Sequence, residues 1–213
     1  MVREPGSGGR SGSTRTWTGE DDSERRSWKW PSTSSTAVRT MYYREAIRNN
    51  VNGGSSMTEL VRTSLFLSWC HQDVEAKEAL LGLLHLDGLA GVRISWWEDS
   101  HLLLGEDWRR RILARLDGCD YGLLLLSPGF FDSRFILKEE LPRLFGPGVN
   151  KVLPVMLKRV LMDGSRELHG VDARQIFLGA GGRCFTETRG PGRERFALDL
   201  ATKIRERVLS DAA

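Results

Sequence analysis

The feature that most constrains the fold is an apolar run without alternation, YGLLLLS at residues 121–127. Successive side chains of a strand point to opposite faces of a sheet, so a strand with one wet face alternates apolar and polar residues. A run that is apolar at nearly every position instead predicts a strand covered on both faces, as in parallel sheets packed between helices. We therefore expect residues 121–127 to be a buried strand of an α/β domain.

Segments with strand and helix character alternate along residues 64–209, with short loops between them. Strands are expected at residues 64–69, 91–97, 121–127, 150–157 and 174–178, and helices at 73–86, 106–117 and 195–209. The helices follow from apolar residues that recur every three to four positions. Asp73 is expected to cap the first helix, and Trp108 is expected to pack in the core from the second. This alternation predicts a doubly wound α/β layer around a parallel sheet.

A sheet of this kind binds ligands at the carboxyl ends of its strands, near the point where the strand order reverses. The loops that leave those ends are residues 68–73, 96–108, 127–140 and 156–173. Candidate site residues are therefore sought in these four loops.

Cysteine and histidine usage limits the chemistry that such a site can have. Cys70, Cys119 and Cys184 are scattered and contain no Cys-x-x-Cys pair, which argues against a disulfide framework and a zinc site and fits a reducing cytoplasm. The four histidines form no pair or cluster along the sequence, so no metal site is predicted. No apolar run reaches the roughly 18 residues of a transmembrane helix, so no membrane association is expected.

Residues 1–56 differ in character from the rest of the chain. They are rich in Ser, Thr, Gly and Arg and have no apolar period, so they cannot bury enough apolar surface to offset the entropy of ordering, and a disordered tail is expected. Two alternatives stay open: its tryptophans anchor a partner, or translation starts at Met57, because Gly53-Gly54 before it fits a translated ribosome-binding sequence. The net charge of +3 lies entirely in this segment, so residues 57–213 show no basic excess for nucleic-acid binding.

Four segments stand in order at the expected strands and the loops that follow them. They are LFLSWCHQD at 65–73, ISWWEDSHLLLGEDW at 94–108, GLLLLSPGFFDSRFILKEEL at 122–141 and KVLPVML at 151–157. Together they resemble the Toll/interleukin-1 receptor (TIR) domain, especially its bacterial branch, from about Ser64 to Val208. The resemblance implies a TIR domain at residues 57–213, with a flavodoxin-like fold: five parallel strands in the order 2-1-3-4-5 and helices on both faces.

The resemblance implies two classes of function. Many bacterial and plant TIR domains are NAD+ nucleosidases that cleave the nicotinamide–ribose bond, giving nicotinamide plus ADP-ribose or a cyclised product, in signalling or antiphage defence. NAD+ is then a substrate, and neither a cofactor nor a metal is required. Other TIR domains are non-catalytic adaptors that signal by self-association or by binding further TIR domains. A third alternative is a module that senses a nucleotide without turning it over.

The enzymes of the family depend on one glutamate after the third strand, in a segment that usually reads Ser-x-Trp-Cys-x-x-Glu-Leu. In SRFILKEELPRLF, residues 133–145, matching the first Ser to Ser133 makes Glu139 the catalytic residue. Counting back from the Glu-Leu-Pro that several bacterial members carry makes it Glu140, which we favour. The alternative is that both glutamates lie on a solvated helix face and pair with neighbouring cations.

The resemblance also implies substrate contacts at the other strand ends. Ser68 and Trp69 are expected on the adenine or ribose side of NAD+. Trp97 and Phe135 are expected to wall the nicotinamide. Asp99 begins the loop that in this family gates the site and makes contacts between TIR domains.

Overall fold

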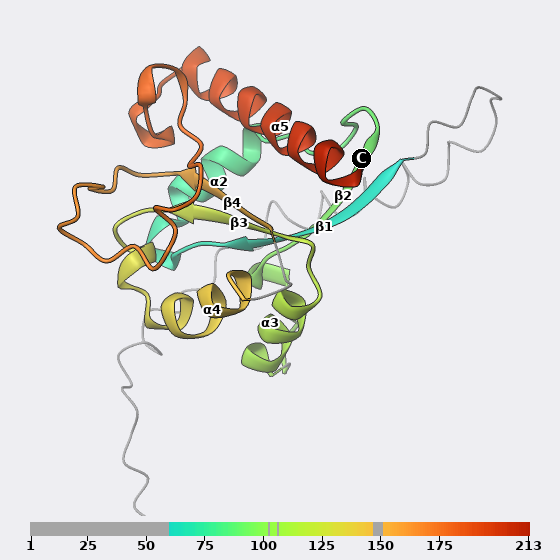
Figure 1. Cartoon of the computed structure of the whole chain (residues 1–213), viewed down its shortest axis with the longest axis vertical. Coiled ribbons are helices and arrows are strands. Elements are labelled where there is room, and N and C mark those ends of the chain that lie inside the picture. Colours follow the sequence, from blue (N-terminus) through green and yellow to red (C-terminus); the bar gives the residue numbers. More distant parts are fainter. Residues whose placement is uncertain (1–59, 102, 106, 147–150) are drawn as a thin grey trace, which may run out of the picture. The chain divides into compact units, whose positions relative to one another are not determined.

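The computed structural model of this chain describes residues 60–101, 103–105, 107–146 and 151–213 (Figure 1). All of them fall in one compact unit, residues 57–213. The disordered tail predicted for the first 56 residues and the alternative start at Met57 lie outside the described residues.

The centre of the unit is a parallel sheet with the strand order β2-β1-β3-β4. Its strands are β1 (Val61–Ser68), β2 (Val92–Trp97), β3 (Tyr121–Leu126) and β4 (Lys151–Met156). The order of these four strands is the predicted one. The register places Phe66 opposite Trp97 and Ser68 opposite Leu124, so the carboxyl ends of β1, β2 and β3 lie at the same edge of the sheet.

The described sheet has four strands in place of the five predicted. The segment expected as the fifth strand, residues 174–178, forms a single parallel bridge between Phe177 and Val155. The Phe177 N–H donates to the Pro154 carbonyl at 2.8 Å, and its carbonyl accepts from the Met156 N–H at 3.0 Å. Before this bridge the next donor of β4 would be the N–H of residue 154, which proline lacks. After it the next donor would be the Lys158 N–H, which donates to the Leu126 carbonyl instead. The ladder therefore has one rung.

Helices cover both faces of the sheet (Figure 1). One face carries α2 (Val74–Leu83) and α5 (Pro191–Ala212), and the other carries α3 (Trp108–Asp117) and the short α4 (Leu141–Leu144). A π-helical turn, Ile136–Glu140, leads directly into α4. No helix in the described part of the chain combines the length and apolar character that crossing a bilayer requires.

The uniformly apolar strand β3 divides its side chains between these two helical layers. Leu123 and Leu125 belong to the core under α2 and α5, and Leu124 and Leu126 belong to the core under α3 and α4. None of the four is more than 2% exposed. Burying a leucine side chain stabilises a fold by roughly 2 kcal/mol, so β3 contributes to both cores, as its sequence predicts.

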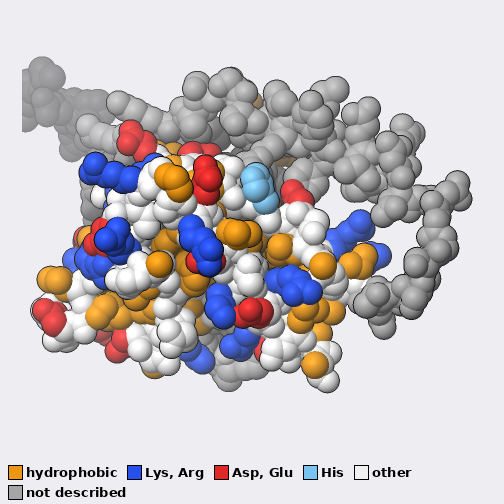
Figure 2. All heavy atoms as spheres, turned by 90° about the horizontal axis from the view of Figure 1, so that it is seen from above, with side chains coloured by type: hydrophobic (Ala, Val, Ile, Leu, Met, Phe, Trp, Pro, Cys, Tyr) orange, Lys and Arg blue, Asp and Glu red, His pale blue; other side chains and the backbone are white. Residues whose placement is uncertain are grey.

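The last helix, α5, is longer than predicted and is strongly two-faced. Its buried line consists of Phe196, Leu200, Ile204 and Val208. On the face seen from above in Figure 2, Lys and Arg side chains are interspersed with Asp and Glu. Exposed pairs on α5, such as Arg207 with Asp211 at 2.8 Å, follow this mixed pattern.

Trp108 does not take the core position that its spacing predicts. Ile112 and Leu116 on the same helix are 3% and 0% exposed, whereas Trp108 is 43% exposed at the start of α3. Its ring packs on Phe135, with 5.1 Å between the centroids. The first turn of α3 therefore lies at the rim of the core, where a large aromatic ring is only half covered.

Asp73 does not act as the predicted helix cap. It directly precedes α2, but its side chain forms no capping hydrogen bond. The carboxylate is 3% exposed, accepts a hydrogen bond from the Ser127 hydroxyl and pairs with Lys158 Nζ at 2.6 Å. Since Ser127 follows β3 and Lys158 follows β4, Asp73 joins three strand ends.

Candidate functional site

The segment that carries the two glutamates enters its helix through an unusually wide turn. The turn begins at Ser133, whose hydroxyl accepts the Ile136 N–H at 3.4 Å. The Leu141 N–H then donates to the Ile136 carbonyl, five residues back. An α-helix would require a donor at position 142, where Pro142 has none, and the wide turn accommodates this loss. Such π-turns occur frequently at functional sites.

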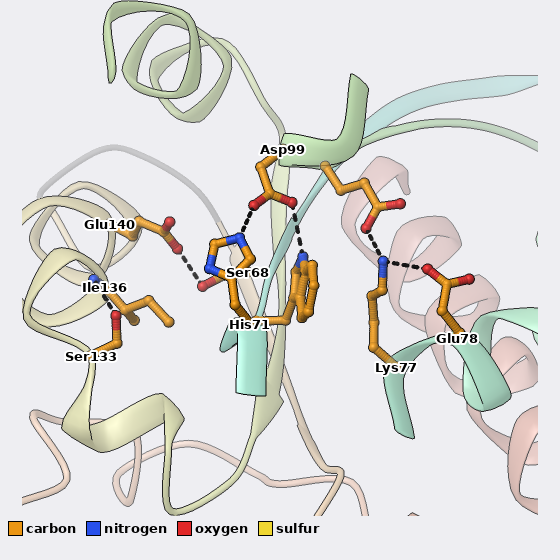
Figure 3. Close-up of polar contacts among 10 residues, drawn as sticks. Ser68, His71, Lys77, Glu78, Asp99, Ser133, Ile136 and Glu140 are labelled. Carbon is orange, nitrogen blue, oxygen red and sulfur yellow. Dashed lines mark hydrogen bonds and ion pairs between the residues drawn. The ribbon is translucent and has the colours of Figure 1, made fainter. Parts of the chain in front are cut away.

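Glu140 points from this turn into the domain. It is 7% exposed, and its Oε2 accepts a hydrogen bond of 2.5 Å from the Ser68 hydroxyl at the end of β1 (Figure 3). Burial raises the pKa of Glu140 to about 7, and the charge of Asp99 adds to the rise. The hydrogen bond from Ser68 and the charge of His71 act in the opposite direction. The carboxyl group is therefore poised between its two protonation states near neutral pH.

Glu139, one residue earlier, lies on the α3 side of the same turn. Its carboxylate accepts hydrogen bonds from Arg109 and from Arg143, the latter at 3.1 Å, and its side chain is 21% exposed. The hydrogen bond from Arg109 is the main cause that lowers the pKa of Glu139. Glu139 is thus an ionised, paired group, in contrast to Glu140.

Asp99 connects the loops that leave β1 and β2. It begins a short 3₁₀ helix after β2, and its side chain is 14% exposed. Its Oδ1 accepts the indole N–H of Trp69 at 3.2 Å, and its Oδ2 lies 2.5 Å from Nε2 of His71. The imidazole lies between Asp99 and the Ser68–Glu140 pair (Figure 3).

A buried lysine also contacts Trp69. Lys77 of α2 is 1% exposed, and its Nζ lies 4.2 Å from the centroid of the Trp69 ring. The same ammonium pairs with Glu98 at 2.8 Å and with Glu78 at 2.7 Å. A buried lysine requires such partners. The contacts fix the Trp69 indole between a cation and the Asp99 carboxylate.

The two aromatic residues predicted as walls, Trp97 and Phe135, are held by packing contacts. Trp97 stacks on Phe66, with 5.5 Å between the centroids and 28° between the planes, and it packs against the core under α3 and α4. Phe135 packs on Trp108 and on the same core. The structure therefore brings together Ser68, Trp69, Asp99 and Glu140, and it gives Trp97 and Phe135 packing contacts on the α3 side.

Comparison with known protein families shows to which family this chain is related. The family model described as TIR domain matches residues 65–180, more than half of the chain. The chain belongs to the TIR-domain family. A search of curated proteins returned no match to it.

The TIR match spans every residue gathered around Glu140. The arrangement offers a substrate few but specific groups: a carboxylate with one oxygen engaged by Ser68, a fixed indole and one imidazole. A carboxylate has about four acceptor positions, and the serine uses one of them. Glu140 can therefore still accept hydrogen bonds from hydroxyl groups. Among the described residues, His, Cys, Asp and Glu form no group of three or more that could hold a metal ion.

Sequence reasoning missed two residues of this candidate site, His71 and Lys77. His71 follows β1 and Asp99 follows β2, and these are neighbouring parallel strands whose register pairs Phe66 with Trp97. Side chains that follow such paired ends meet, so the strand order combined with the register contained the signal for His71. For Lys77 the signal was weaker, since a lysine in an amphipathic helix is usually exposed.

Proposed function

We propose that this TIR domain cleaves NAD+ at the nicotinamide–ribose bond, with Glu140 as the catalytic carboxylate. The products are nicotinamide and either ADP-ribose or a cyclised form of it. The observation that supports this most is the buried Glu140 beside Ser68 at the carboxyl edge of the sheet. Parallel α/β sheets bind nucleotides at this edge.

The reaction requires little from the protein. The ring nitrogen of nicotinamide is positively charged in NAD+, so the electron pair of the breaking bond leaves with a neutral base. Positive charge then develops on the ribose, as in glycoside cleavage. Water adds to the anomeric carbon and loses one proton, or a nucleophile of the same molecule adds instead. The Glu140 carboxylate would orient the ribose hydroxyls and stabilise the developing charge in a site of low dielectric constant.

The other residues support this arrangement in different degrees. Ser68 fixes the Glu140 carboxylate, and Asp99 fixes Trp69, which would contact the nucleotide. That Trp97 and Phe135 contact the nicotinamide stays a prediction. In the structure both rings pack on the α3 side of the sheet.

The test is NAD+ consumption by the full chain at high protein concentration, with Glu140→Gln and Glu139→Gln side by side. Glu140→Gln should lower turnover by about 100-fold or more, as expected when a group that stabilises transition-state charge is lost. Glu139→Gln should keep most of the activity, since this residue pairs with arginines away from Ser68. Equal activity in both variants would exclude Glu140 as the catalytic residue. A wild-type chain without turnover, even when concentrated, would favour the adaptor function.

A second function, assembly through contacts between TIR domains, is favoured by one specific surface. Leu103 and Leu104 are 70% and 99% exposed in the loop before α3, close in sequence to the half-exposed Trp108. Exposed apolar residues gathered in this way mark interaction surfaces. Leu104→Glu should weaken self-association of the full chain in sedimentation experiments, and unchanged sedimentation would argue against this surface.

A further inference from the structure

His71 occupies a position that packing alone does not explain. Its side chain is about half exposed, yet its Nε2 is held 2.5 Å from Asp99 Oδ2. The opposite edge of the ring turns toward the Ser68 hydroxyl and the Glu140 carboxylate (Figure 3). The ring also lies 4.9 Å from the indole of Trp69. Asp99 and Trp69 thus hold the imidazole in one orientation beside Glu140.

The charges around this imidazole favour its protonated form. Burial lowers the pKa of His71, but the hydrogen bond to Asp99 and the charges of Asp99 and Glu140 outweigh it, so its pKa is raised. Lys77, the cation on the α2 side, opposes the rise.

The groups that shift the pKa of Glu140, besides burial, are Ser68 of β1, Asp99 after β2 and His71 after β1. The arginines that α3 and α4 direct toward this segment, Arg109 and Arg143, pair with Glu139 instead. His71 is therefore the cation that acts on Glu140 from these elements.

We propose that His71 is a positioning residue of this site, whose imidazolium, oriented by Asp99, favours the carboxylate form of Glu140. This inference rests on the proposed role of Glu140 in NAD+ cleavage. A protonated carboxyl group cannot stabilise an oxocarbenium-like ribose as an anion does. Burial and the nearby Asp99 both favour protonation of Glu140, and an imidazolium beside it acts against both.

The test is the pH dependence of kcat/KM for NAD+ cleavage by the full chain. In His71→Gln, the acid limb of the profile should move to higher pH by about one unit, the lower end of what a neighbouring cation causes. Activity should recover at high pH, where Glu140 ionises without help. In His71→Lys, which keeps a positive charge, the limb should stay close to that of the wild type. A limb that does not move in His71→Gln would overturn the proposal.

A matched control separates this effect from the loss of any imidazole. His85 is exposed and follows α2, whose end lies at the opposite edge of the sheet from the strands' carboxyl ends. His85→Gln should leave the acid limb in place. An equal shift in His85→Gln and His71→Gln would show a general charge effect and would also overturn the proposal.

A second readout does not depend on turnover. Carbon-13 NMR of the glutamate carboxyl groups follows the ionisation of Glu140 directly, with its signal assigned by its loss in Glu140→Gln. The midpoint of that titration should rise in His71→Gln by the same amount as the acid limb. A raised midpoint without NAD+ cleavage in the wild type would overturn the proposed function alone. NAD+ cleavage with an unchanged midpoint would overturn the role of His71 alone.

Discussion

Two carboxylates are buried at the same edge of the sheet, and their surroundings differ in one important respect. Asp73 is 3% exposed and Glu140 is 7% exposed. Each accepts a hydrogen bond from a serine at the end of a strand, Ser127 beside Asp73 and Ser68 beside Glu140. By burial and by hydrogen bonding the two groups are nearly alike.

The difference is the cation. Lys158 pairs with Asp73 at 2.6 Å, whereas Glu140 is influenced by the imidazole of His71 and has no ammonium partner in the described structure. A close ammonium compensates the desolvation of a carboxylate, which then acts as a structural link. Without one, burial leaves the pKa of Glu140 at about 7, and a carboxyl group with a shifted pKa is a candidate for chemistry. The presence of the lysine thus separates a paired, structural carboxylate from one that is a candidate for chemistry.

Removing Lys158 should have the largest effect on stability that we expect, because Asp73 would then be buried without an ammonium partner, as Glu140 is. Lys158→Met leaves the Asp73 carboxylate buried beside Ser127 without a counter-charge and should lower the free energy of unfolding by about 3 kcal/mol at pH 8. Urea denaturation at pH 8 measures this loss.

The neighbouring Arg159 provides the control for that experiment. It pairs with Glu187 at 2.5 Å, but the Glu187 side chain is 38% exposed whereas that of Asp73 is 4% exposed, and exposed pairs contribute little to stability. Arg159→Met should therefore lower the free energy of unfolding at pH 8 much less than Lys158→Met does. Equal losses in the two variants would break the comparison.

The converse experiment neutralises the carboxylate that has no lysine. The pKa of Glu140 is raised from 4.5 to about 7, so its ionisation costs stability as the pH rises through that window, by at most about 3 kcal/mol above pH 7. Glu140→Gln avoids this cost but weakens the hydrogen bond from Ser68, worth about 1 kcal/mol. The variant should be about 2 kcal/mol more stable than the wild type at pH 8 and no more stable at pH 4.5. A pH-independent difference between the two proteins would contradict a raised pKa.

The sequence predicted the central strand and favoured Glu140, but it did not predict that Lys158 pairs with Asp73. Uniform apolarity predicted the doubly covered β3, and the resemblance counted from Glu-Leu-Pro favoured Glu140. The role of Asp73 was mistaken for a cap, because a local motif cannot show that Lys158, 85 positions later, follows an adjacent part of the same sheet edge. The shortened fifth segment depended in the same way on Pro154 facing it from β4. Local sequence patterns predict helices and strands. Which buried carboxylate has a cation beside it depends on contacts between segments that are far apart in the sequence.

The two serines provide a smaller test of the comparison. The Ser127 hydroxyl donates to Asp73 and also accepts the Phe130 N–H at 3.0 Å, so Ser127→Ala should cost about 1.5 kcal/mol of stability. NAD+ cleavage by the folded protein should persist. Ser68→Ala removes the donor that opposes protonation of Glu140 and should instead reduce cleavage at neutral pH, with partial recovery at higher pH. Thermal unfolding and NAD+ consumption, measured on both variants, show whether Ser127 mainly affects stability and Ser68 mainly affects cleavage.

The smallest effect is expected one residue away from Glu140. Glu139 has its pKa lowered by the hydrogen bond from Arg109, so it contributes stability above its unfolded pKa, and the contribution is lost as the pH falls through the folded value. Arg109 is 59% exposed, so the pair is screened by solvent, and Glu139→Gln should lower stability at pH 8 by less than about 0.5 kcal/mol, with no difference in strong acid. The sign is opposite to that expected for Glu140→Gln, although the residues are adjacent and the substitution is the same. Chemical denaturation of the two variants at pH 8 compares them directly. If the stabilities of both variants changed in the same direction, the side of the turn on which a glutamate lies would not determine its effect on stability.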